Sequence, residues 1–214
     1  MKKTIFLLAF VAVSFAAFSQ IVPPNQGGTF FGRVTYRPTY WDDSQVPGLA
    51  VVGGSTAPGL INFAGSSDVK VYGFDGGSRD EDAHFSIQLS HAYKEGTDLE
   101  PHLHWCETAA PTSASDTNVV WAMTYSIQNV DGTFSAPTTL YATNSITGTN
   151  WTHKIAGFDP DIDGTDLKIS SVLVGSVKRI ASSASDTYDK DAALLSLDFH
   201  YQTDAPGSRE NLVK

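Results

Sequence analysis

The sequence predicts an all-β protein, an antiparallel β-sandwich of a jelly-roll-like type. Three observations indicate this fold. Apolar and polar residues alternate with a period of two in several runs, as in strands that bury one face. Helical periodicity is nearly absent after residue 20, and turn residues separate the alternating runs. Roughly eight or nine strands joined by loops suit two stacked sheets.

Residues 1–19 predict a secretory signal peptide. Lys2 and Lys3 precede an apolar run, and the small residues Ala17 and Ser19 stand where a signal peptidase cleaves. An uncleaved anchor is the alternative. Cleavage would take the net charge from −9 to −11, because two lysines and no acid are lost. We expect a secreted or periplasmic protein, free of the membrane after cleavage, whose acidity argues against binding nucleic acid.

The rest of the chain divides into two expected parts. Residues 20–66 predict an extended N-terminal arm and an irregular segment, and residues 67–214 predict the β-sandwich domain. The arm begins with polar residues around Pro23 and Pro24, and residues 42–66 are rich in Gly, Pro and Ser with little alternation. A chain of this length is enough for one domain.

Alternation locates the strands of the sandwich. Residues 119–127 and 193–201 place large apolar residues at odd positions, which is typical of half-buried strands. Residues 167–180 are apolar on both faces in places, as in a central strand. The Ala-, Ser-, Thr- and Asp-rich stretches 108–117 and 181–191 predict exposed loops. Further strands are expected at residues 30–36, 69–74, 84–89, 134–141 and 150–155.

The most informative motif lies within residues 95–107. On a strand, His102 and His104 would share one face, while Leu103 and Trp105 would face the core. Two imidazoles about 7 Å apart along a strand are candidate ligands of a transition metal. In a homotrimer, six such imidazoles on the symmetry axis would resemble the H-x-H sites of long phage tail fibres. The alternative is that both histidines are hydrogen-bonded surface or interface residues.

A cupin-like metal enzyme is a less favoured hypothesis for the same motif. Gly96 has the expected spacing, but Glu107 follows the second histidine too closely, and the second cupin motif is missing. No nucleophile accompanies Asp198 and His200, which share a strand face and are interpreted as a surface pair. Cys106 is the only cysteine and is expected to be an inert, partly buried thiol. The sequence therefore predicts a protein that is not an enzyme.

An acidic segment offers a weaker candidate for calcium. Asp159, Asp161 and Asp163 match the first half of a calcium-binding loop, in which carboxylates and a glycine turn surround a hard cation. The glutamate that should complete the loop is absent, since Ser170 stands there. A solvated acidic turn is the alternative interpretation.

Two neighbouring aromatic residues offer a weak candidate for ligand binding. Tyr40 and Trp41 lie in the irregular segment, where exposed rings could stack on sugars. Packing beneath a loop is the alternative. Together with the candidate calcium loop, they suggest as the alternative function a secreted carbohydrate- or ligand-binding module that calcium would stabilise.

Four segments carry a resemblance when they are taken in order. They are residues 89–105, with the H-x-H-W motif, then 119–125, 185–192 and finally 198–210, with D-x-H-Y followed by G-S-R-E. Over roughly residues 80–214 the chain resembles a poorly characterised family of tailed-phage and viral-metagenome proteins regarded as virion structural proteins.

The resemblance implies a capsid- or tail-associated structural protein without enzymatic activity. With the H-x-H motif, it predicts a homo-oligomer, expected to be a trimer, with other virion proteins, cell-surface proteins or glycans as further partners. A phage gene would imply location in the virion. The signal peptide departs from the family pattern and suggests instead a bacterial gene of prophage origin or a domain recruited for secretion.

Overall fold

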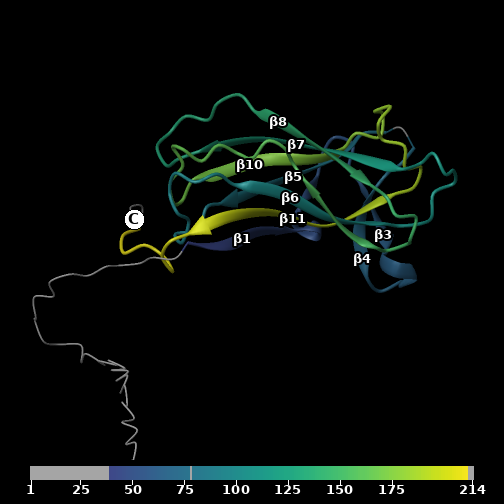
Figure 1. Cartoon of the computed structure of the whole chain (residues 1–214), viewed down its shortest axis with the longest axis horizontal. Helices are drawn as coiled ribbons and strands as arrows, with labels where there is room; N and C mark the ends of the chain where they lie inside the picture. Colours follow the sequence, from purple (N-terminus) through teal and green to yellow (C-terminus); the bar gives the residue numbers. More distant parts are fainter. Residues whose placement is uncertain (1–38, 78, 212–214) are drawn as a thin grey trace, which may run out of the picture. The chain divides into compact units, whose positions relative to one another are not determined.

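The structure, a computed structural model, describes residues 39–77 and 79–211 (Figure 1). The expected signal peptide, most of the arm and the expected strand at residues 30–36 lie outside these residues. The described residues belong to one compact unit, residues 37–214. Within the described part of this unit, two antiparallel sheets form a sandwich and no α-helix occurs, which confirms the predicted fold class. No helix there is long and apolar enough to cross a membrane.

The first sheet, called sheet A, has β11 at its centre. It runs in the order β3-β4-β11-β6-β9, and β1 also pairs with β11. β1 and β4 share one edge of β11, because β1 pairs along residues 196–203 and β4 along residues 192–194. The strands are β1 (Tyr40–Pro47), β3 (Gly59–Asn62), β4 (Lys70–Phe74), β6 (Glu100–Glu107), β9 (His153–Gly157) and β11 (Ala192–Thr203).

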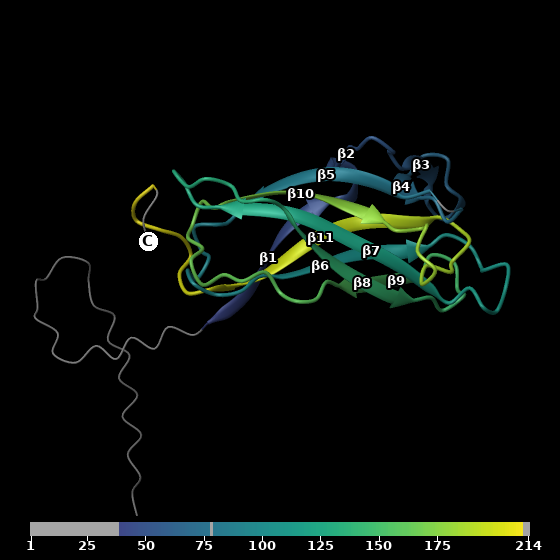
Figure 2. The ribbon, with the colours of Figure 1, turned by 90° about the horizontal axis from the view of Figure 1, so that it is seen from above.

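The second sheet, called sheet B, runs in the order β2-β5-β10-β7-β8 (Figure 2). All of its pairings are antiparallel. Its strands are β2 (Val52–Gly53), β5 (Glu81–Gln88), β7 (Asn118–Gln128), β8 (Thr138–Ser145) and β10 (Val172–Arg179).

The strand order is that of a jelly roll. From β4 to β11 the chain crosses between the sheets at every step except the β7–β8 hairpin. The result is two four-stranded groups, β4-β11-β6-β9 and β5-β10-β7-β8, which is the arrangement of eight strands in a double-sheet jelly roll.

The core lies between the two sheets and is rich in aromatic rings. Trp105 from β6 and Trp121 from β7 are fully buried, and their ring centroids lie 6.2 Å apart. Phe74 meets Trp121 edge-on at 5.2 Å between centroids, a favoured geometry for aromatic pairs. Leu103 is also fully buried. The prediction that Leu103 and Trp105 face the core is therefore confirmed.

The segment expected to be irregular differs from the prediction. Residues 42–66 contain most of β1 together with β2 and β3, so the sandwich begins near Tyr40 and not at residue 67. In β1 only Val46 is buried, and the remaining side chains are exposed or partly exposed. Alternation is missing because backbone pairing with β11 holds the strand in place, with little burial of side chains.

Gly48 allows the chain to turn away from β11 after β1, so that β4 can pair with the rest of the same edge of β11. Gly48 opens the short 3-10 turn η1 (Gly48–Ala50) that follows β1. A Cβ atom at Gly48 would lie 2.7 Å from the carbonyl oxygens of Leu194 and Leu195. Only glycine therefore allows the turn to lie this close to the β11 backbone.

Several expected element boundaries also shift, and β5 begins at Glu81 and not at residue 84, while β9 begins at His153 and not at residue 150. β10 begins at Val172 and not at residue 167, because Ser170 adopts a φ of 63° in the preceding turn. β8 begins at Thr138 and not at residue 134. The loop expected to be exposed at residues 181–191 is anchored inside the protein by Tyr188, which is fully buried.

Arg179, at the end of β10, anchors this loop. The guanidinium is fully buried and forms a two-pronged ion pair with Asp186, at 3.0 Å from Nε and 2.8 Å from Nη2. Its remaining hydrogens donate to the carbonyls of Phe74, Tyr188 and Lys190. All five donors of the guanidinium are therefore used, which is the condition under which a buried charge is tolerated.

Replacing Asp186 by alanine is expected to lower the free energy of unfolding by about 3–5 kcal/mol, because Arg179 would keep a buried charge without its partner. Asp189→Ala in the same loop is the control. Asp189 pairs with Lys190 where both side chains are partly exposed, and such pairs contribute about 1 kcal/mol or less. Urea unfolding measures both variants, and equal losses would contradict the anchoring role of Arg179.

Candidate functional site

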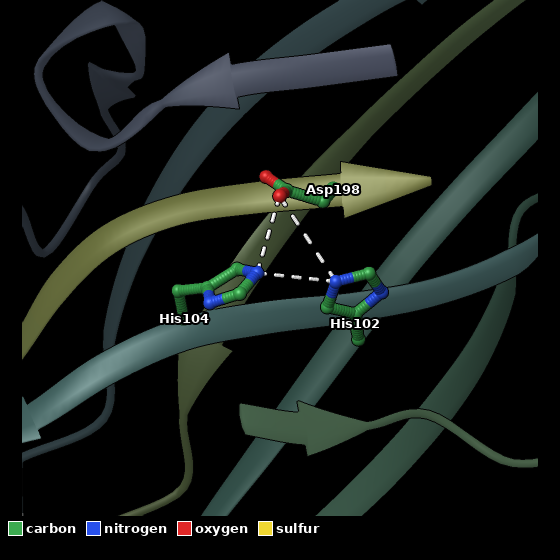
Figure 3. A group of neighbouring side chains, drawn as sticks. All are labelled: His102, His104 and Asp198. Atoms are coloured by element: carbon green, nitrogen blue, oxygen red, sulfur yellow. Dashed lines mark hydrogen bonds and ion pairs between the residues drawn. The ribbon is translucent and has the colours of Figure 1, made fainter. Parts of the chain in front are cut away.

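The outer face of sheet A, the face turned away from the core, carries a histidine–aspartate cluster. The pleat of β6 turns Leu103 and Trp105 inward and therefore turns His102 and His104 outward. β11 lies beside β6, and the register places Asp198 directly opposite His102. Two histidines from one strand and a carboxylate from its neighbour thus meet on one face (Figure 3).

The three side chains converge on a small region. His102 Nε2 and His104 Nε2 lie 3.2 Å apart, and Asp198 Oδ2 lies 3.2 Å from His104 Nε2 and 4.0 Å from His102 Nε2 (Figure 3). Within residues 39–77 and 79–211, no other group of three or more His, Cys, Asp or Glu residues places its ligand atoms so close together. Two imidazoles and one carboxylate are donors that suit zinc and neighbouring transition metals.

The carboxylate of Asp198 is buried although it lies on an outer face. The residue is 1% exposed, and its Oδ2 accepts a hydrogen bond of 3.0 Å from the Gln45 amide on β1. In the described part of the chain, Oδ1 has no hydrogen-bond partner. Burial of a carboxylate is unfavourable unless positive charge or hydrogen bonds compensate it.

Two more histidines surround the cluster, so four of the six histidines in the chain lie on this face. His153 on β9 places Nε2 at 2.6 Å from His104 Nδ1. The ring of His200 on β11 lies 4.3 Å from that of His102 between centroids, tilted by 51°, and His200 pairs with Asp43 at 2.8 Å. Burial lowers the pKa of His104, and the nearby carboxylate of Asp198 opposes this shift.

Sequence reasoning identified two members of the cluster and missed the third. His102 and His104 share one face as predicted, but the further metal ligands were expected from other chains around a symmetry axis. The same chain supplies Asp198, which had been interpreted as a surface partner of His200. Its place on the polar face of residues 193–201 was visible in the sequence, whereas the pairing of β11 with β6 was not.

Glu107, the third ligand that a cupin-like site would need, binds other residues. Glu107 is fully buried, and its carboxylate accepts hydrogen bonds from the backbone of Thr147 at 2.6 Å and Gly148 at 2.7 Å. Glu107 therefore closes the loop before β9 and does not join the histidines. Cys106 is buried, and burial raises the pKa of its thiol, which favours the unreactive protonated form.

The three aspartates of the candidate calcium loop do not converge. Ile162 forms an isolated bridge with Leu99, so the segment is extended where a calcium loop would curl. Asp163 Oδ1 instead accepts hydrogen bonds from the amide and hydroxyl of Thr165, which lower the pKa of Asp163. Together with Asp159 and Asp161 it forms no metal-sized group in the described part of the chain. The calcium site at Asp159, Asp161 and Asp163 therefore stays a prediction, and in the described residues these side chains form no close group of ligands.

The two candidate sugar-stacking residues are exposed but separated by the pleat. Tyr40 is 62% exposed and Trp41 is 53% exposed, both at the start of β1. Neighbouring residues of a strand point to opposite faces, so the two rings cannot form one platform. Trp41 lies opposite Gln202 on the face that carries the histidine cluster.

The outer face of sheet B is nearly free of charge. In β5, β7, β8 and β10, the outward side chains with full charges are Asp82 and Lys178, which lie opposite each other. Val174 is 50% exposed near the middle of this face. Besides Val174, the outward residues include His84, Ser86, Gln88, Thr124, Ser126, Thr139, Tyr141, Thr143 and Ser176. This neutral face contrasts with a net charge of −9 for the whole chain.

Comparisons with known proteins include two distant structural likenesses. No protein-family model and no curated protein match the chain. The structure of infectious bursal disease virus Gx strain is similar at 14% identity and a TM-score of 0.35, covering 77% of this chain and 32% of that one. An arabinose-bound MgGH51 α-L-arabinofuranosidase is similar at 12% identity and 0.30, covering 76% and 23%. The chain spans a third or less of each structure, and neither likeness indicates a function.

Calcium is expected to leave the thermal unfolding temperature of the protein unchanged. The carboxylates of Asp159, Asp161 and Asp163 do not meet, and several converging oxygens are needed to hold this ion. Differential scanning calorimetry with and without millimolar calcium measures the effect. A calcium-dependent rise that disappears in the Asp163→Asn variant would show that the loop binds the ion.

Proposed function

We propose that this chain is a non-enzymatic structural or interaction protein, similar to capsid- or tail-associated virion proteins, that assembles with copies of itself. The observation that carries the proposal is the neutral outer face of sheet B. The sequence resemblance over roughly residues 80–214 supports the virion-like role. The predicted signal peptide supports secretion, and a phage origin of the gene would place the protein in a virion.

The charge distribution favours self-association through this face. Each chain has a net charge of −9, so two copies repel each other when charged surfaces approach. On the neutral face the single lysine and single aspartate cancel. Interface centres are depleted of charged residues in general. A second copy can therefore approach here with less repulsion than at acidic surfaces.

Apolar side chains and a hollow add contact area to this face. Val52 and Tyr141 are 69% and 58% exposed. A groove of about 430 Å³ adjoins the face at its β2 edge. It is lined by residues of β1, η1, β2, β5 and β10 without a charged side chain, namely Gln45, Val46, Pro47, Ala50, Val52, His84, Phe85, Ser86 and Val174. Burial of such surface is the main favourable term in protein association.

A matched pair of substitutions tests the proposal. Val174→Glu places a carboxylate in the neutral face and is expected to weaken self-association at least tenfold. Val69→Glu is the control, because Val69 is also 50% exposed but lies outside sheet B. Size-exclusion chromatography with light scattering across micromolar concentrations measures the assembly. A wild-type protein that stays monomeric, or equal weakening by both variants, would contradict the proposal.

The second candidate function is a secreted carbohydrate-binding module, which the exposure of Trp41 favours. Gln202 lies opposite Trp41 and Asp43 follows two residues later on the same face, so a sugar stacked on the indole would find polar partners. Trp41→Ala is expected to abolish binding on a glycan array, whereas Tyr40→Ala, on the opposite face, is expected to retain it. Absence of any bound glycan with the wild-type protein argues against this function.

A further inference from the structure

The spacing of the donors in the histidine–aspartate cluster suits one metal ion. At the usual zinc–nitrogen and zinc–oxygen distances, two donors of a tetrahedral ion lie about 3.3–3.5 Å apart. Two separations in the cluster are 3.2 Å, and the third, between His102 Nε2 and Asp198 Oδ2, is 4.0 Å. A movement of the His102 ring by about 0.6 Å would bring the third separation into this range, and the other two lie only about 0.1 Å below it.

The buried carboxylate provides a second and independent reason for a cation. Asp198 is 1% exposed, and its Oδ1 has no hydrogen-bond partner among the described residues. The contacts of its Oδ2 are the neutral amide of Gln45 and the two imidazoles. A divalent ion would supply the positive charge that a buried carboxylate requires.

The surrounding side chains already orient the donors. A neutral imidazole carries a hydrogen on one nitrogen and a lone pair on the other. If His104 Nδ1 donates to His153 Nε2 at 2.6 Å, the lone pair of His104 Nε2 points toward the cluster. Gln45 donates to the Asp198 carboxylate in the same way that outer partners fix metal-binding carboxylates.

We propose that His102, His104 and Asp198 of a single chain bind one divalent transition-metal ion of the zinc class. Two imidazoles with one carboxylate select such ions over calcium and magnesium, which prefer oxygen donors alone. The ion joins β6 to β11, the two central neighbours of sheet A, and therefore stabilises the folded state. A water molecule completes the coordination. This site lies on the face opposite to sheet B and does not depend on self-association.

The test uses the whole secreted chain, stripped of metal with a chelator and then dialysed against zinc. Elemental analysis is expected to find one zinc per chain, and the thermal unfolding temperature is expected to rise with zinc concentration. Asp198→Asn keeps the shape of the side chain and removes its charge, so zinc affinity should fall at least tenfold. His84→Gln is the control, because His84 is an exposed histidine on the outer face of sheet B.

Three results would overturn the proposal. The first is a wild-type protein that holds no more zinc than Asp198→Asn, and the second is an equal loss of zinc in His84→Gln. The third is one zinc per three chains, which would indicate a site shared by three chains on a symmetry axis. Circular dichroism verifies that Asp198→Asn is folded, and His104→Gln provides a second variant if it is not. Light scattering on the same samples separates this proposal from self-association, since zinc binding in a monomer supports only the metal site.

Discussion

The antiparallel register between β6 and β11 is the constraint on which the core and the candidate site both depend. It places Leu103 beside Leu197 inside the sandwich and, one residue away, His102 beside Asp198 outside. Because side chains alternate along a strand, a slip of one residue would turn Asp198 into the core and a leucine to the surface. The energy of core burial therefore fixes the geometry of the cluster, without any requirement that the polar residues stabilise the fold themselves.

Buried charged side chains at the ends of two strands hold the neighbouring loops in place. Glu107 ends β6 and holds the loop before β9, and β9 in turn brings His153 to His104. Arg179 ends β10 and fixes the loop that leads into β11. Both groups are fully buried, and each has a full set of hydrogen-bond partners, so their charges are compensated where they lie. The loop before β9 and the loop predicted at residues 181–191 are thus each held by a charged side chain at the end of a neighbouring strand.

Sequence patterns predict the features that depend on side-chain burial, but they do not predict which strands pair with each other. Most strands of the sandwich show alternation because one face must be apolar, and the shared face of His102 and His104 follows from the same pleat. β1 was missed because backbone hydrogen bonds to β11 hold it, and these leave no trace in side-chain pattern. Asp198 was missed as a cluster member for a related reason: it lies 96 positions from His102 along the chain, and only the strand register brings them together.

The two outer faces of the sandwich differ in the side chains that they carry. Sheet A gathers four histidines around a buried carboxylate, whereas sheet B presents hydroxyl, amide and valine side chains whose one lysine and one aspartate cancel. The chain is strongly acidic as a whole, whereas the outer face of sheet B has no net charge. The negative charge of the chain therefore lies on other parts of it. The core lies between the two faces, so a metal ion on one does not contact a partner on the other. Self-association through sheet B would leave the cluster of each copy turned outward, with its donors supplied by one chain.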